Sequence, residues 1–175
     1  FVATHLAGMA GMAMWTLVEW VKLGKPTTLG AASGAIAGLA TITPAAGFVG
    51  PNSAVLIGLI AGFVCFVAVN VKTRLGYDDS LDVVGIHGVG GVVGTLLLGV
   101  FASTAVNPAG ADGLLAGSIV QLGKQTLGVV VVCVYAFAVS WLLLKAIHGT
   151  MGLRLSPEHE VQGLDSTEHS ETAYS

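Results

Sequence analysis

Several stretches of this chain are apolar over the length that a helix needs to cross a lipid bilayer, and this feature restricts its fold more than any other. A bilayer core of roughly 30 Å requires about 20 mostly apolar residues in a helix. Five segments meet or approach that length: 1–22, 28–44, 52–72, 80–103 and 114–148. The chain is 54% hydrophobic and 10% charged, more apolar than one water-soluble core can hide. We therefore predict an all-α, polytopic helical membrane protein.

The basic residues indicate how the five segments are oriented. Short cytoplasmic loops collect Lys and Arg, whereas loops on the opposite side do not. The loops near 45–51 and 104–113 contain neither residue. Six of the seven basic residues fall on the other side: Lys22, Lys25, Lys72, Arg74, Lys145 and Arg154. We therefore expect the N-terminus of this chain to lie outside the cell and the C-terminus to be cytoplasmic.

The end of the chain differs in composition from the rest. From Ser156 onward acidic residues are frequent and apolar runs are absent, so this part cannot span a membrane. We expect residues 1–150 to form a membrane domain and residues 151–175 to form a cytoplasmic tail. Phe1 is not an initiator methionine, and we expect further sequence upstream of it.

Composition and motifs argue against several classes of function. A net charge of −3 gives no basic patch for a nucleic acid backbone. Neither a nucleophile elbow, a phosphate-binding glycine loop nor an HExxH sequence occurs, so we do not expect an enzyme. The histidines lack the spacing of metal ligands, and we expect neither a metal site nor a cofactor.

Two features inside the apolar segments have both a structural and a functional interpretation. Gly30, Gly34 and Gly38 recur every four residues and form a small-residue stripe, which favours close helix packing over pore lining. Lys124 lies a few turns into the longest segment. It is either part of a portion that projects beyond the membrane or an intramembrane counter-ion, and the segment length favours the first interpretation.

The segment 80–103 contains the main candidate for a functional residue. Asp78, Asp79 and Ser80 precede its apolar run and can satisfy free backbone N–H groups at a helix start. We place Asp82 in the first helical turn, where it either caps the helix or takes part in transport. We place His87 about two turns inside the segment, among glycine, valine and isoleucine.

A histidine buried in such a segment without a partner is energetically costly. In helical spacing the imidazole shares a face with small or apolar residues, namely Val83, Gly90, Gly91 and Gly94. His87 therefore either bonds to a neighbouring helix or lines a narrow passage, where a neutral imidazole offers one donor and one acceptor. Spacing alone does not separate these two alternatives.

Several stretches resemble the C-terminal half of the ammonium transporter family, the Amt/MEP/Rh proteins, and are most similar to the bacterial Amt branch. The similar stretches are Gly24-Lys25-Pro26-Thr27, Gly30 to Leu39, Thr43 to Val49, Asp79 to Gly91, Gly163-Leu164-Asp165 and Glu168-His169. The resemblance implies an eleven-helix fold, a homotrimer with one pore per subunit and a location in the inner (plasma) membrane. This chain would supply five transmembrane helices, the seventh to the eleventh.

The resemblance also implies a role for two residues. His87 takes the place of the second of two pore histidines, and Val83 would line the same hydrophobic conduit. The partner histidine and the outer recognition site would lie upstream of Phe1. Ammonium would be recruited outside and lose its proton, and ammonia would then cross the conduit.

The tail resembles the regulatory C-terminus that works with PII-type signal proteins at the cytoplasmic face, although Ser170 stands where the family usually has glycine. Two alternatives to transport remain: an ammonium sensor or receptor with the same fold, and a fragment that is inactive on its own. The short tail favours transport over a sensor with an output domain.

Overall fold

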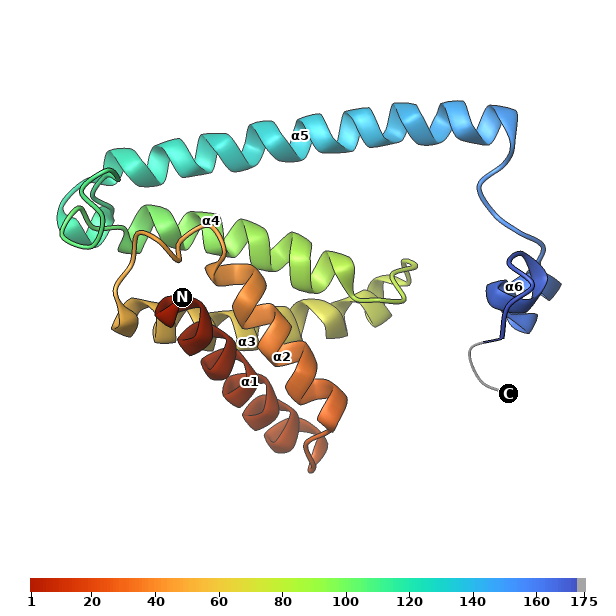
Figure 1. The fold of residues 1–175 in the computed structure, drawn as a ribbon, viewed down its shortest axis with the longest axis horizontal. Helices are drawn as coiled ribbons and strands as arrows, with labels where there is room; N and C mark the ends of the chain where they lie inside the picture. Colours follow the sequence, from red (N-terminus) through yellow and green to blue (C-terminus); the bar gives the residue numbers. More distant parts are fainter. Residues whose placement is uncertain (173–175) are drawn as a thin grey trace. The chain divides into compact units, whose positions relative to one another are not determined.

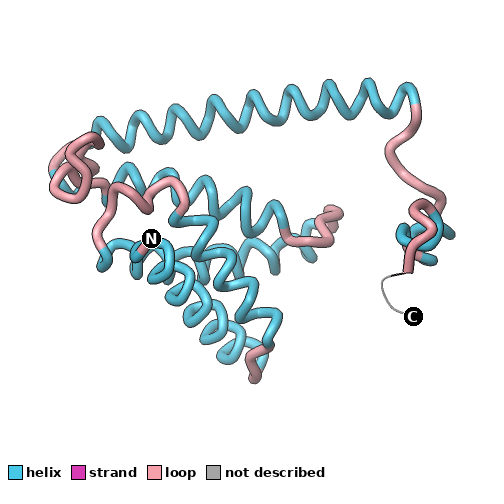
Figure 2. Tube along the Cα trace, in the orientation of Figure 1, coloured by secondary structure: helices cyan, strands magenta, loops and turns pink. Residues whose placement is uncertain are grey.

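The structure, a computed structural model, describes residues 1–172, and these residues form helices joined by loops, with no strand among them (Figures 1 and 2). In chain order the elements are α1 (Val2–Leu23), α2 (Thr28–Ile42), α3 (Pro51–Leu75), the π-helical turn η1 (Val84–Gly88), α4 (Val89–Phe101), the 3-10 turn η2 (Leu114–Ala116), α5 (Ile119–Thr150), α6 (Pro157–Gln162) and α7 (Leu164–Thr167). The chain divides into two compact units, Phe1–Val131 and Val132–Ser175. The predicted all-α class is confirmed.

Within residues 1–172, three helices are long and apolar enough to cross a membrane, namely Pro51–Leu75, the continuous η1–α4 helix Val84–Phe101 and Ile119–Thr150. Helix α2 is apolar but has only 15 residues. Helix α1 has 22 residues but also contains a buried glutamate, Glu19. The three long helices make this a multi-pass membrane protein, and crossing by α1 and α2 stays a prediction.

The helix ends follow from the residues at the segment breaks. Gly24 and Gly76 end α1 and α3 in the left-handed conformation, with φ of 81° and 69°, which costs glycine little because it has no Cβ. Pro51 begins α3, where its missing N–H leaves no helical bond unmade. Gly117, with φ of 95°, ends η2 and delays the start of α5 to Ile119, later than the expected start at residue 114.

Helices α1, α2 and α3 lie against one another (Figure 1), and their backbones come into direct contact. A methyl group at Gly11 would lie 2.5 Å from the carbonyl oxygen of Gly34, and one at Gly62 would lie 2.5 Å from the carbonyl oxygen of Gly11. At Gly34 it would lie 2.5 Å from the Cβ of Trp15. The predicted packing role of the glycine stripe in α2 is therefore confirmed.

A buried carboxylate fixes the loop between α1 and α2. Glu19 is 7% exposed, and its carboxylate oxygens accept hydrogen bonds from the backbone N–H of Thr27 at 2.9 Å and from its hydroxyl at 3.0 Å. The Thr27 hydroxyl oxygen in turn accepts from the N–H of Gly30 at 2.9 Å and caps α2. A methyl group at Gly30 would lie 2.2 Å from a carboxylate oxygen of Glu19, so a side chain there would displace this carboxylate.

The second unit, considered alone, contains the end of α5 and the two short helices of the tail. Ser156 caps α6 by accepting from the N–H of His159 at 3.3 Å. Arg154 donates to both carboxylate oxygens of Glu160 at 3.1 and 3.2 Å. Ser170 has a φ of 54°, a conformation in which glycine is less strained. The division at residue 150 into membrane domain and cytoplasmic tail stays a prediction.

The packing of α1 on α2 generates a first expectation. In the full-length parent protein, Gly34→Ala should lower the free energy of unfolding by about 1–3 kcal/mol, because the new methyl group meets backbone atoms that cannot move independently. Thermal unfolding in detergent measures the change. Gly128→Ala is the matched control, since no atom of residues 1–172 outside its own helix lies within 4 Å of that added methyl. Equal midpoints for both variants would contradict the packing role.

Candidate functional site

The helix that carries His87 begins at an aspartate cap. The carboxylate of Asp79 accepts hydrogen bonds from the backbone N–H groups of Val83 and Val84, both at 2.9 Å. This confirms that an acidic residue before the apolar run caps the helix. The expected helix start at residue 80 is wrong, because residues 80–82 form the turn that brings Asp79 over the free N–H groups.

Asp82 lies outside the helix rather than in its first turn. Its backbone has a φ of 56°, in the left-handed region, which aspartate tolerates better than most residues. Its carboxylate forms an ion pair with Lys72 near the end of α3, and the Lys72 ammonium also donates to the carbonyl oxygen of Asp79 at 2.7 Å. Asp82 therefore does not cap the helix; it ties the turn to α3.

The first turn after the cap is a π-helical turn, η1, and it contains His87. The N–H of Val89 donates to the carbonyl oxygen of Val84, five residues earlier, instead of following the regular α-helical pattern. Single π-helical turns are uncommon and often occur at functional sites, because the extra residue redirects a side chain and loosens the backbone ladder. His87 thus lies closer to the helix start than the predicted two turns.

The imidazole of His87 is exposed on the surface of the described chain, and no hydrogen-bond partner for it occurs in residues 1–172. Val83 is 49% exposed and Val84 is 50% exposed. A methyl group at Gly91 would meet no other atom within 4 Å there. His87 and Gly91 are therefore open to a partner or a passage that this part of the chain does not fill.

Gly90 and Gly94 do not share this open surface, contrary to expectation. A methyl group at Gly90 would lie 2.9 Å from the Thr41 hydroxyl oxygen, and one at Gly94 would overlap the Thr41 carbonyl. Both glycines are buried against α2. The predicted stripe is wrong in this respect, because the π-helical turn changes the rotation per residue on which regular spacing depends.

Two residues behind the turn are not predicted by the sequence. Thr41 and Cys65 are fully buried next to each other, and the Cys65 thiol donates to the carbonyl oxygen of Ile86 at 3.9 Å. They pack against the side of η1 opposite to the exposed imidazole. A threonine and a cysteine in apolar helices give no local signal of this role, because only the packing of α2, α3 and η1 brings them together.

The other histidines lie apart from this site. His5 contacts the ring of Phe1, with 4.4 Å between the ring centres. His159 lies 3.1 Å from a carboxylate oxygen of Glu168. In the portion of the chain that the structure describes, no group of three or more His, Cys, Asp or Glu side chains is placed to hold a metal ion.

These features define the class of protein: a multi-pass helical membrane protein with a capped, π-distorted helix that presents a histidine. Residues 1–174 match the Ammonium Transporter Family, and the chain belongs to that family. This chain is 49% identical over 175 residues to the ammonium transporter of Bacillus subtilis (strain 168). The matched region covers 99% of this chain and 43% of that protein. The ammonium transporter Amt1 of Archaeoglobus fulgidus is 45% identical, with the same coverage.

Solved structures agree with this assignment. The crystal structure of Saccharomyces cerevisiae Mep2 matches with a TM-score of 0.85 and 38% identity, covering 90% of this chain and 37% of that one. A protein described as Sensor Amt Protein matches with a TM-score of 0.85 and 30% identity, covering 95% and 40%. The chain thus spans less than half the length of these relatives.

The cap on the histidine-bearing helix can be tested directly. Asp79→Ala should destabilise the first turn by about 0.5–2 kcal/mol, since two backbone N–H groups lose their acceptor. Amide hydrogen exchange in the full-length parent should therefore become faster at Val83 and Val84. Ser80→Ala is the control, because that exposed side chain makes no hydrogen bond within residues 1–172. Unchanged exchange in Asp79→Ala would contradict the capping role.

Proposed function

We propose that this chain forms one part of the wall of an ammonia-conducting pore in a longer ammonium transporter, with His87 and Val83 lining the conduit. The observation that carries the proposal is the imidazole of His87, exposed and without a partner in residues 1–172 although it lies on a membrane-spanning helix. Family membership supports the substrate, since the similar proteins are named ammonium transporters.

The chemistry of such a pore favours the neutral molecule. Moving an unpaired cation through an apolar passage is very costly, whereas ammonia carries no net charge. A neutral imidazole can accept a hydrogen bond at one ring nitrogen and donate at the other. His87 would thus replace part of the hydration that ammonia loses, while the apolar Val83 side chain would exclude bulk water.

The remaining features of the transporter are part of the same proposal. A second histidine from the rest of the parent protein would face His87 and complete a pair that passes ammonia and, separately, a proton. The subunits would form a homotrimer in the inner (plasma) membrane. The N-terminus of this chain would lie outside, and residues 151–175 would form a cytoplasmic tail that can meet a PII-type signal protein. The distribution of basic residues supports this orientation.

The role of His87 is tested in the full-length parent. His87→Ala should reduce the current induced by ammonium or methylammonium about tenfold or more, because loss of a hydrogen bond in an apolar passage costs about 1–3 kcal/mol. His5→Ala is the control, since that imidazole already contacts Phe1. Equal currents in the parent and both variants would contradict the proposed role of His87. A parent that binds ammonium without any current would instead support a sensor or receptor.

A separate expectation concerns residues 1–175 expressed alone. The chain covers 43% of the length of the relatives from Bacillus subtilis and Archaeoglobus fulgidus, and the surface around His87 is open. We expect no ammonium flux and a lower unfolding temperature than that of the parent. Size-exclusion chromatography with multi-angle light scattering, followed by flux into proteoliposomes, measures both. A stable trimer of the fragment that conducts ammonium would refute this expectation.

A further inference from the structure

Helix α4 contains one glycine that its own packing does not explain. Of the four glycines in α4, Gly90, Gly94 and Gly99 lie against other parts of the chain. At Gly99, for example, an added methyl group would lie 2.7 Å from the Cα of Leu122. A methyl group at Gly91 would meet no other atom within 4 Å in the described part of the chain. Gly91 is therefore open, whereas the other glycines of its helix are packed.

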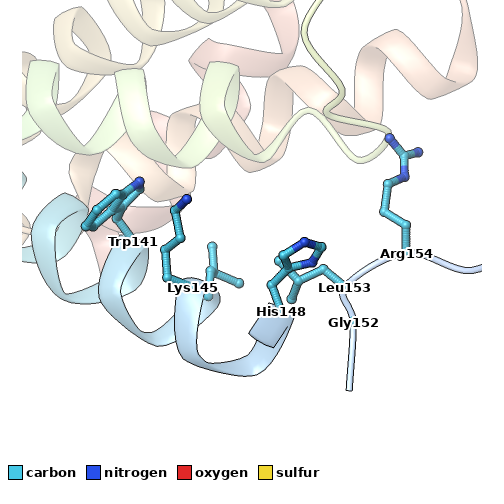
Figure 3. Close-up of a pocket in the computed structure, with 7 residues that line it drawn as sticks. Trp141, Lys145, His148, Gly152, Leu153 and Arg154 are labelled. Atoms are coloured by element: carbon cyan, nitrogen blue, oxygen red, sulfur yellow. The ribbon is translucent and has the colours of Figure 1, made fainter. Parts of the chain in front are cut away.

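The backbone of Gly91 does not require a glycine either. Glycine is often needed where φ is positive, as at Gly152 beyond the end of α5, where φ is 82° (Figure 3). Gly91 is not among the residues with positive φ, and it lies inside the continuous helix Val84–Phe101. Glycine in a helix interior is less favourable than alanine, because it loses more conformational freedom on folding. This cost brings no gain in packing or in turn geometry within the described chain.

Gly91 lies one helical turn after His87, on the same open surface. Residues four apart are neighbours on a helix, with about 5–6 Å between their Cβ atoms. The imidazole of His87 is exposed, and a methyl group at Gly91 would stand free beside it. At Gly88, which precedes Gly91 on this surface, an added methyl group would already contact the Val84 side chain at 3.9 Å. A side chain at position 91 would thus project next to the imidazole.

The open surface at Gly91 offers space rather than a hydrogen-bonding group. The carbonyl oxygen of Gly91 accepts a hydrogen bond from the Thr95 hydroxyl at 2.8 Å, in addition to the backbone N–H that a regular α-helix supplies. Both lone pairs of that oxygen are then occupied. A molecule beside His87 therefore meets no free carbonyl at this level, and the missing side chain affects only the available width.

We propose that Gly91 is a specificity-determining residue, whose missing side chain leaves enough width beside His87 for a small substituted amine as well as for ammonia. This inference rests on the proposed pore lining by His87. Methylamine exceeds ammonia by one methyl group, and non-bonded carbon atoms need about 3.5–4.0 Å between their centres. A methyl group at position 91 would occupy the space that the methyl group of methylamine needs, and ammonia would still pass.

The test uses the full-length parent protein in proteoliposomes and compares the currents induced by ammonium and by methylammonium. The parent should carry both. In Gly91→Ala the ratio of the two maximal currents should shift about tenfold in favour of ammonium, since one methyl group in an apolar site gives discrimination of this order. Gly91→Val, with a larger side chain, should lower both currents. Gly128→Ala is the matched control, because its methyl group is equally open within residues 1–172, and it should leave the ratio unchanged.

Thermal unfolding of the same variants separates a pore role from a packing role. Gly91→Ala should unfold at a temperature no lower than that of the parent. Gly94→Ala should unfold earlier, because its methyl group overlaps the Thr41 carbonyl. An unfolding temperature of Gly91→Ala as low as that of Gly94→Ala would show that another helix of the parent packs on Gly91, and would overturn the proposal.

The transport measurements can also overturn it. A parent that carries ammonium current but no methylammonium current, or an unchanged current ratio in Gly91→Ala, would refute the role of Gly91. Full current in His87→Ala contradicts the proposed role of His87. An unchanged ratio in Gly91→Ala together with low current in His87→Ala contradicts the role of Gly91 alone, so the two failures are distinguishable.

Discussion

Direct backbone contact between α1, α2 and α3 is the constraint on which the rest of the unit Phe1–Val131 depends. In lipid, burial of apolar side chains gives little preference for one helix neighbour over another, so van der Waals contact and hydrogen bonds decide which surfaces meet. Glycines at the crossings let the helices approach until the carbonyl of Gly11 lies against α2 and α3. The Trp15 and Phe66 rings then meet edge to face, with 5.4 Å between their centres. These three helices form the support for α4.

The turn that carries His87 is held by polar groups at its start and by close packing behind it. Asp79 satisfies the first free N–H groups, and the pair between Lys72 and Asp82 ties the same turn to α3. Behind it, Gly94 meets the backbone at Thr41 on α2. Held from both sides, the π-helical turn directs the imidazole away from the support. This arrangement explains how a histidine on an apolar helix can remain unpartnered within residues 1–172.

Much of the candidate site could be predicted from local sequence. An acidic cluster before an apolar run predicts a capped helix start. A histidine among glycines and valines predicts a residue that either bonds to a neighbouring helix or lines a passage. The exact cap was not predictable, because Asp79 and Asp82 both have the chemistry of a cap and only the backbone conformation selects Asp79. The predicted stripe through Gly90 and Gly94 is wrong because it requires regular helical rotation, which η1 interrupts.

The sequence by itself determined the all-helical membrane class, the main helix breaks, the packing role of Gly34 and the presence of His87 in an apolar helix. These properties are set by residues close together in the chain: apolar length, glycine and proline at the breaks, and spacing along one helix. Only the tertiary structure decided that Glu19 fixes the start of α2 and that Cys65 supports the π-helical turn. Those roles need partners from other helices, and the distance between two helices is fixed by packing, which no local pattern encodes.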